Sequence, residues 1–183
     1  MVMDVDITEK KEGKKGSFLT ELLQALLMAG ILAFIIRAFL ITPFYIPSRS
    51  MEPTLYPGDR ILVNRLAYRF GEPQRGDVVV FRYPLEPDRD YIKRVIAVGG
   101  DTVEARDNKI YVNGEPLLET YLPPGVVYSN FGPLKVPPNT YFMMGDNRNI
   151  SADSRVWGPL ERKFIIGKAI LIYWPLEHAG LIK

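Results

Sequence analysis

Cysteine is absent from the 183-residue chain, and histidine occurs once, at position 178. The lack of cysteine excludes disulfides, thiolate zinc sites and a cysteine nucleophile. With a single histidine, a metal site built from several histidines is impossible, and a Ser-His-Asp triad would have to use His178. We interpret His178 as a residue with no catalytic part, and we expect neither a metal nor an organic cofactor.

The chain also has little excess of charge of either sign. The chain has 23 lysines and arginines against 21 acidic residues, a net charge of +2, and no basic run is interleaved with aromatic residues. This balance argues against nucleic acid as a partner. Apolar residues make up 47% of the chain, which favours a packed core over a disordered protein.

One long apolar run lies near the start of the chain. From Leu22 to Ile41 the only polar residues are Gln24 and Arg37. About 20 helical residues at ~1.5 Å each span ~30 Å, the thickness of the hydrocarbon core of a bilayer. We therefore expect a polar cytoplasmic tail over residues 1–16, a transmembrane anchor helix over 17–42 and an extracytoplasmic domain over 43–183.

The orientation of this anchor follows from four lysines on its N-terminal side, at positions 10, 11, 14 and 15, which predict a cytoplasmic N-terminus. Arg37 lies about one turn from the end of the run, so its side chain can extend to the lipid head groups. Two alternatives remain. A buried helix of a soluble protein would show a polar face, and a cleavable signal peptide would need a small-residue exit such as Ser48 and Ser50.

The rest of the chain is rich in glycine and proline and has the pattern of short strands. Runs of Val, Ile, Tyr and Phe bounded by turn residues predict strands over 60–66, 77–83, 91–98, 102–106, 109–112, 141–144 and 164–174. Asn113-Gly114 predicts a tight hairpin turn. We expect a mainly β fold, an antiparallel folded sheet or barrel-like domain.

Between Glu115 and Thr140 the pattern is weak, and we expect ordinary loop packing there. The alternative is an apolar lip that rests on the bilayer, as interfacial aromatic residues do. Its members would be Tyr121, Leu122, Val126, Val127, Tyr128 and Phe131.

A hydrolase without a usable histidine or cysteine needs another base, and a lysine in an apolar setting can serve. Lys93 is the candidate, because strand alternation puts it on one face with Tyr91 and Val95. Desolvation would lower its pKa and leave neutral amine near neutral pH. Taken alone, a lysine in a strand is more often a solvated surface residue.

The nucleophile candidate lies in a stiff, proline-flanked segment just outside the apolar run, which contains Ser48 and Ser50. Turn chemistry alone would explain this segment as a linker.

Several motifs, in order, resemble those of type I signal peptidases. They are Ser48-Arg49-Ser50-Met51-Glu52-Pro53, Gly58-Asp59, Arg75-Gly76-Asp77, Tyr91-Ile92-Lys93-Arg94, Gly100-Asp101, Gly145-Asp146-Asn147-Arg148 and Ser151-Ala152-Asp153-Ser154-Arg155. The resemblance covers about three quarters of the chain. It implies a membrane-anchored serine endopeptidase of the signal peptidase fold, which removes signal peptides from exported preproteins with a Ser/Lys dyad on the periplasmic or thylakoid-lumen side.

The resemblance also implies a role for each matching residue. Ser50 takes the place of the nucleophile and Lys93 that of the general base. Ser48 matches a residue that helps the Ser50 backbone N–H form an oxyanion hole, and Ser151 matches a serine that hydrogen-bonds the lysine amine. Asp153 and Arg155 match a supporting ion pair. The walls of the pockets that take small substrate residues at −3 and −1 are expected to be Phe44, Ile46, Leu55, Tyr91 and Ile92.

The match has departures. Asn149-Ile150 stands where the family commonly has Asp-Asn before the orienting serine. This difference motivates an alternative function, a catalytically degenerate, membrane-tethered β domain that binds exported chains. A soluble Ser/Lys self-cleaving regulator is a third possibility, but it would normally carry a DNA-binding domain, for which the chain has no basic helix.

Overall fold

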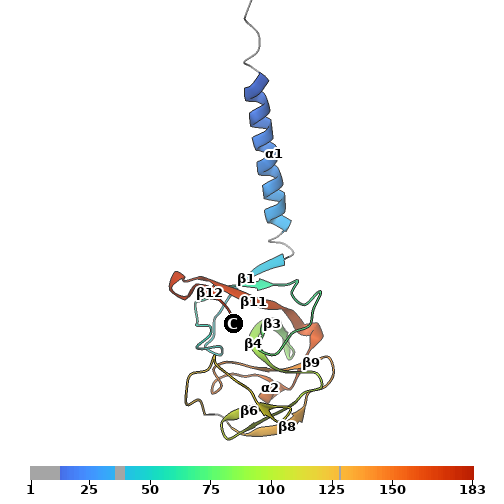
Figure 1. The fold of residues 1–183 in the computed structure, drawn as a ribbon, viewed down its shortest axis with the longest axis vertical. Coiled ribbons are helices and arrows are strands. Elements are labelled where there is room, and N and C mark those ends of the chain that lie inside the picture. The colour runs from blue at the N-terminus through green and yellow to red at the C-terminus, as the bar shows by residue number, and fades with distance from the viewer. Residues whose placement is uncertain (1–12, 36–39, 128) are drawn as a thin grey trace, which may run out of the picture. The chain divides into compact units, whose positions relative to one another are not determined.

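The computed structural model describes residues 13–35, 40–127 and 129–183. The chain divides into two compact units, residues 1–38 and residues 39–183. Figure 1 shows the elements of both units along the chain.

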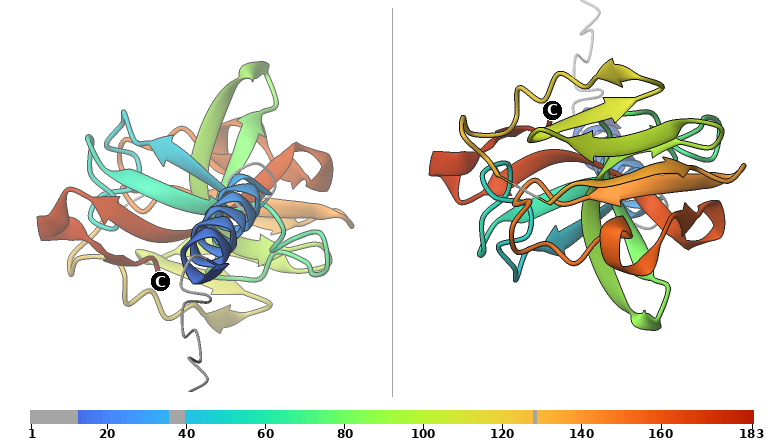
Figure 2. Two further views of the ribbon diagram at one scale, coloured as in Figure 1. Left: turned by 90° about the horizontal axis from the view of Figure 1, so that it is seen from above. Right: turned by 90° about the horizontal axis from the view of Figure 1, so that it is seen from below.

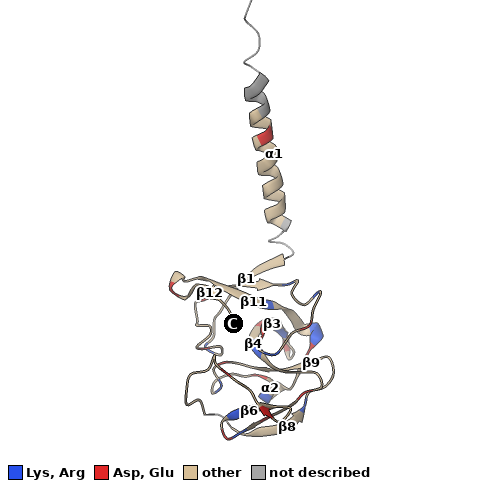
Figure 3. Ribbon diagram, in the orientation of Figure 1, with Lys and Arg blue, Asp and Glu red and all other residues tan. Residues whose placement is uncertain are grey.

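The first unit contains one helix, α1 (Gly13–Ile35). All its described side chains, at positions 18–34, are exposed, and Glu21 is the only charged residue among them (Figure 3). In the described part of the chain, no helix meets the length and hydropathy expected of a membrane span.

The helix bounds differ from the predicted range of 17–42. The helix already includes Gly13, and Ile41 begins a strand, while the anchor itself stays a prediction. The strand forms because residues 41–45 pair with β2 (Arg60–Asn64), which satisfies their backbone groups outside the helix. Residues 1–12 of the predicted polar tail and Arg37 lie outside the described residues.

The second unit is built from two antiparallel sheets, as the mainly β prediction requires. The first sheet has the order β1-β2-β11-β3-β4-β9-β10, with β12 added to β11. Its strands are β1 (Ile41–Tyr45), β2 (Arg60–Asn64), β3 (Val78–Tyr83), β4 (Glu86–Val98), β9 (Thr140–Met144), β10 (Leu160–Glu161), β11 (Ile165–Trp174) and β12 (Gly180–Leu181).

The second sheet has the order β7-β6-β5-β8. Its strands are β5 (Thr102–Arg106), β6 (Lys109–Val112), β7 (Glu115–Pro116) and β8 (Phe131–Lys135). In Figure 1, β6 and β8 lie at the opposite end of this unit from β1, β11 and β12. The described residues of the unit also form three short helices, α2 (Ser154–Trp157), η2 (Arg162–Phe164) and η3 (Leu176–His178).

The predicted strands agree closely with the observed ones where the sequence alternates between turn signals. The predictions for 102–106 and 109–112 are confirmed at both ends. The turn at Asn113-Gly114 is also confirmed, since both residues have positive φ and Val112 pairs with Glu115 across the hairpin.

The prediction of an unpatterned loop over 115–140 was wrong for β7 and β8. Strand β8 pairs with β5 although it contains Gly132 and Pro133, two residues that weaken a strand pattern. It can do so because β8 is an edge strand, where a proline leaves no ladder hydrogen bond unmade.

Strand β4 is the structural centre of the unit. Six successive residues, Ile92 to Ala97, are buried, so both faces of this strand are covered. Ile92 belongs to a cluster with residues of β2 and β11, Val95 packs with Phe81 and Met143, and Ile96 packs with the second sheet. Figure 2 shows the two sheets from the two ends of the unit. Any polar side chain on this part of β4 is therefore withdrawn from water.

Candidate active site

Ser50 lies in a loop between β1 and β2 that is closed by its own backbone. Ile46 N–H donates to Asp59 O at 2.9 Å, and Gly58 N–H donates to Ile46 O at 2.9 Å. Met51 and Leu55 are fully buried beneath the loop. These contacts hold the segment in one conformation, which a plain linker would not have.

The Lys93 amine donates a hydrogen bond to Ser50 Oγ at 2.8 Å, across 43 positions of sequence. It donates a second one to its neighbour Ile92 O, also at 2.8 Å. Lys93 is only 3% exposed. Burial lowers the pKa of the Lys93 amine to about 8, while the carboxylates of Asp153 and Asp146 raise it and oppose part of this effect. A large fraction of the amine is therefore neutral at mildly alkaline pH.

Ser48 Oγ lies 3.3 Å from Ser50 Oγ. The two hydroxyls are neighbours on the same side of the loop, with the exposed Arg49 side chain between them in sequence and paired to Glu52 at 3.0 Å. A hydroxyl donor therefore lies beside the oxygen that would attack a substrate carbonyl.

Ser151 does not make the hydrogen bond to Lys93 that the resemblance implies. Its Oγ is buried and has no hydrogen-bond partner among the described residues, so the structure shows no bond from Ser151 to Lys93. The amine makes its bonds to Ser50 and Ile92 instead. The orienting role of Ser151 stays a prediction.

Asp153 and Arg155 form an ion pair, with Arg155 Nε donating to Asp153 Oδ1 at 2.8 Å and Nη2 donating to Oδ2 at 2.8 Å. Asp153 is fully buried and also accepts from Gly145 N–H at 3.0 Å. A side chain at Gly145 would come within 2.3 Å of Ser50 O and of Ser151 Oγ. The hydrogen bond from Gly145 to Asp153 thus helps to keep the Gly145 backbone close to the backbone of Ser50.

A cavity of about 290 Å³ opens beside Ser50 and Lys93. Four of the five predicted pocket residues line it, Phe44, Ile46, Tyr91 and Ile92. Leu55 does not line this cavity, because the turn that contains it points inward and buries it fully in the core with Met51. Sequence reasoning missed six further lining residues, Tyr45, Pro47, Val80, Asp90, Ile150 and Ala152.

Val80 illustrates why these residues were missed. It faces Ile92 across the β3–β4 pairing, and the register of that pairing is not readable from either strand alone. Ile150 is 59% exposed and belongs to the departure noted in the sequence. In the sequence, Ile150 is marked only by the Asn149-Ile150 difference from the family motif.

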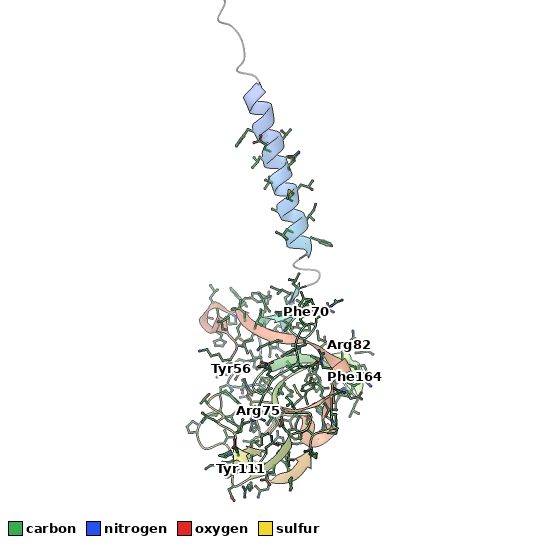
Figure 4. All side chains as sticks on the ribbon, turned by 45° about the vertical axis from the view of Figure 1, so that its right-hand side comes forward. Tyr56, Phe70, Arg75, Arg82, Tyr111 and Phe164 are labelled. Atoms are coloured by element: carbon green, nitrogen blue, oxygen red, sulfur yellow. The ribbon has the colours of Figure 1, made fainter. Side chains whose placement is uncertain are left out.

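The lone histidine lies elsewhere. His178 Nδ1 is 3.0 Å from Asp59 Oδ1, its ring packs 5.2 Å from that of Tyr56, and it does not line the cavity. Figure 4 labels Tyr56 among the side chains of this unit. Among the described residues, no group of three His, Asp or Glu side chains could hold a metal ion.

Residues 19–174 match the family described as signal peptidase, peptidase S26. The chain is 39% identical to "Probable signal peptidase I-2" of Synechocystis over 97% of this chain and 83% of that protein. It is 38% identical to a signal peptidase I of Mycobacterium tuberculosis, covering 96% of this chain and 79% of that protein. It is also 38% identical to a signal peptidase I of Bacillus licheniformis, over 94% of this chain and 97% of that protein. The chain, with its buried lysine beside a loop serine, therefore belongs to the signal peptidase family S26.

Proposed function

We propose that this serine peptidase removes signal peptides with a Ser50–Lys93 dyad, in a domain tethered to a membrane by the segment around α1. One observation carries the proposal, the 2.8 Å contact between the buried Lys93 amine and Ser50 Oγ. A buried lysine beside a hydroxyl, with its pKa lowered by desolvation, is the arrangement that a general base needs.

The reaction follows from this pair. Neutral Lys93 accepts the Ser50 proton while Oγ attacks the carbonyl carbon of the scissile bond, and the resulting ammonium protonates the leaving amine as the C–N bond breaks. The signal peptide is then an ester of Ser50. A water molecule that gives its proton to the same amine attacks the ester, and the proton returns to Ser50 Oγ as the peptide leaves with a free carboxylate.

The substrate lies extended along the free edge of β1, the terminal strand of the first sheet. Main-chain pairing to an edge strand gives affinity, and alternate side chains then enter pockets. The cavity is small and is walled by Phe44, Ile46 and Ile92, so it takes small side chains at −1 and −3 and excludes large ones.

The membrane anchor is supported by the exposed apolar side chains of α1 and by the apolar sequence that continues to Ile41. Apolar residues on all sides of a helix suit a lipid environment. The lysines at positions 10, 11, 14 and 15 favour a cytoplasmic N-terminus, which puts the catalytic unit on the extracytoplasmic side.

The proposed function is tested with detergent-solubilised full-length protein and a preprotein that carries an Ala-x-Ala exit. Cleavage after the second alanine is expected from the wild type and from the control His178→Ala, since His178 does not line the cavity. Mass spectrometry of the mature product identifies the bond. Binding without cleavage, by folded protein with lipid supplied, would instead favour the degenerate binding domain.

Ser48→Ala is expected to lower kcat by about 10²-fold with KM little changed, because a donor aimed at the developing oxyanion acts only in the transition state. The matched control is Arg49→Ala in the same loop, whose exposed side chain should change kcat by no more than about twofold. Equal effects of the two variants would show that Ser48 acts through the loop conformation rather than through its hydroxyl.

A further inference from the structure

Two arginines are buried next to the dyad, and the reaction described above uses neither. Arg94 directly follows Lys93 in β4 and is 1% exposed, and Arg148 is 3% exposed. A buried guanidinium is costly unless its donors are satisfied. What satisfies and covers these groups therefore bears on the dyad beside them.

The edges of the Arg94 guanidinium are filled. Nε and Nη2 donate to the two oxygens of Asp146 at 2.9 and 2.7 Å. Nη1 donates to Gly76 O and to Lys183 O, both at 2.8 Å, and Nη2 also reaches Thr54 Oγ1 at 3.3 Å. Since arginine has five N–H donors, all in one plane, only the two faces of this plane remain open to contacts.

Tyr121 covers one of these faces. Its ring centroid lies 3.9 Å from Arg94 Cζ, a stacking distance at which the ring attracts the cation and keeps water away. The sequence had placed Tyr121 in a weak loop or an apolar lip. The structure instead packs it against charge, while Phe131 of the same stretch, in β8, stacks on Phe142 of β9 in the first sheet. Tyr128 lies outside the described residues.

The tyrosine is itself held in place from its hydroxyl end. Its O–H donates to Glu119 Oε1 at 2.9 Å and accepts from Arg148 Nη2 at 3.3 Å. Glu119 pairs with Arg148, whose Nε donates to Gly145 O at 3.2 Å. Burial raises the pKa of Tyr121 well above its ordinary value, so the ring keeps a neutral hydroxyl. Tyr121 thus bridges the two arginines.

Arg94 connects this contact to both members of the dyad through Asp146. The Asp146 carboxylate raises the pKa of Lys93. Asn147 N–H, next in sequence, donates to Ser50 O at 3.1 Å. The loop that Arg94 holds by its ion pair therefore touches the nucleophile's backbone and acts on the base through its charge.

We propose that Tyr121 is a positioning residue for catalysis, which covers Arg94 and so holds the Asp146 loop against Ser50 and Lys93 without contacting substrate. This inference rests on the proposed dyad. Removing the ring admits water to Arg94, weakens its hold on Asp146 and leaves that carboxylate less neutralised. The less neutralised carboxylate favours charged Lys93, so the neutral fraction of the amine near neutral pH falls without loss of the pocket.

The change in the ionisation of Lys93 can be followed by the pH dependence of kcat, because the groups that face its amine are known. They are Ser50 Oγ, Ile92 O, the carboxylates of Asp146 and Asp153, and the Tyr91 ring at 5.5 Å. Of the two carboxylates, Asp146 is the one held by the arginine that Tyr121 covers, and Asp153 has its own pair, Arg155.

The experiment compares Tyr121→Ala, Tyr121→Phe and Tyr111→Ala in detergent-solubilised full-length protein, with kcat and KM measured on a preprotein from about pH 6 to 10. Tyr111 in β6, labelled in Figure 4, is a matched control. Its ring stacks on Arg106 at 4.2 Å in the second sheet. Tyr121→Ala is expected to lower kcat at neutral pH by about tenfold and to leave KM within about twofold. The acid limb of its kcat–pH profile is expected to shift to higher pH. Tyr121→Phe, which keeps the stack, should restore most of kcat, and Tyr111→Ala should resemble wild type.

The inference is overturned if Tyr121→Ala keeps the wild-type acid limb, or if Tyr121→Ala and Tyr111→Ala lose kcat equally. If Tyr121→Ala does not fold, Tyr121→Leu takes its place, since leucine keeps apolar bulk without a π face; an unshifted limb there would also reject the inference. A wild type whose cleavage does not depend on Ser50 would reject the dyad itself, which is a different result.

Discussion

Ser50→Ala is expected to abolish cleavage, with kcat lowered on the order of 10⁴-fold or more. The variant removes the atom that is proposed to form the acyl-enzyme, and Ser48, whose Oγ lies 3.3 Å from Ser50 Oγ, makes no hydrogen bond to the Lys93 amine that would let it take over. The loss is measured by the rate of mature product formation from a preprotein under single-turnover conditions.

The fold of this variant should be unchanged. The loop is held by Ile46, Asp59 and the buried Met51 and Leu55, none of which depends on the Ser50 hydroxyl. Thermal unfolding of Ser50→Ala should therefore resemble that of wild type, and the variant should still bind preprotein. Retained cleavage in a correctly folded Ser50→Ala protein would remove Ser50 from the mechanism.

Lys93→Met is expected to be similarly inactive and, unlike Ser50→Ala, more stable than wild type at neutral pH. Methionine fills the same space without a charge to bury. The folded-state pKa of Lys93, about 8, is below its ordinary value of 10.5, so folding disfavours the protonated amine. Each pKa unit corresponds to about 1.4 kcal/mol, and loss of the bonds to Ser50 and Ile92 offsets part of this, which leaves a gain of about 1 to 3 kcal/mol.

The pH dependence of stability follows from the same shift. Below about pH 8 the amine is protonated in both states, and the destabilising contribution of Lys93 is fully present. Between about pH 8 and 10.5 the unfolded chain binds the proton that the folded chain has lost, so this group makes stability rise with pH. The stability advantage of Lys93→Met should therefore shrink across this window, which denaturant unfolding at several pH values can measure.

The pH dependence of cleavage by the wild type should report the ionisation of the Lys93 amine. The rate of wild-type cleavage should rise with pH and reach half its plateau near pH 8, where Lys93 loses its proton. Lys93→Arg is the control, because arginine keeps the charge and length of the side chain but stays protonated over this range. A Lys93→Arg protein that cleaves at the wild-type rate would exclude Lys93 as the base.

Much of the second unit could be predicted from local pattern. The alternation between turn residues predicted β5 and β6 with their bounds, and the Asn113-Gly114 turn between β6 and β7, because a two-residue turn with positive φ is a local property. Strand β8 could not be predicted in this way. Its Gly132 and Pro133 carry no strand signal, and the strand exists only because β5 offers it an edge to pair with.

The candidate site divides in the same manner. The sequence alone determined the order of the motifs and named Ser50 and Lys93 as the candidate pair, because residue types and spacing are local and because the motifs resemble those of one family. Four of the five residues that it named as pocket walls line the cavity beside Ser50 and Lys93, and their part in substrate binding stays a prediction. The position of Leu55 depended on which side of the loop turns inward, and that is set by the core beneath it.

Only the tertiary structure decided that Lys93 is buried. Alternation along β4 could put Lys93 on one face, but both faces of the strand are covered, by residues brought from β2, β11 and β9. The same packing buries Arg94, satisfies it with Asp146 and covers it with Tyr121, a residue whose own sequence context carried no signal. Desolvation depends on everything that surrounds a group, so the lowered pKa of Lys93 belongs to the fold and not to the segment that contains it.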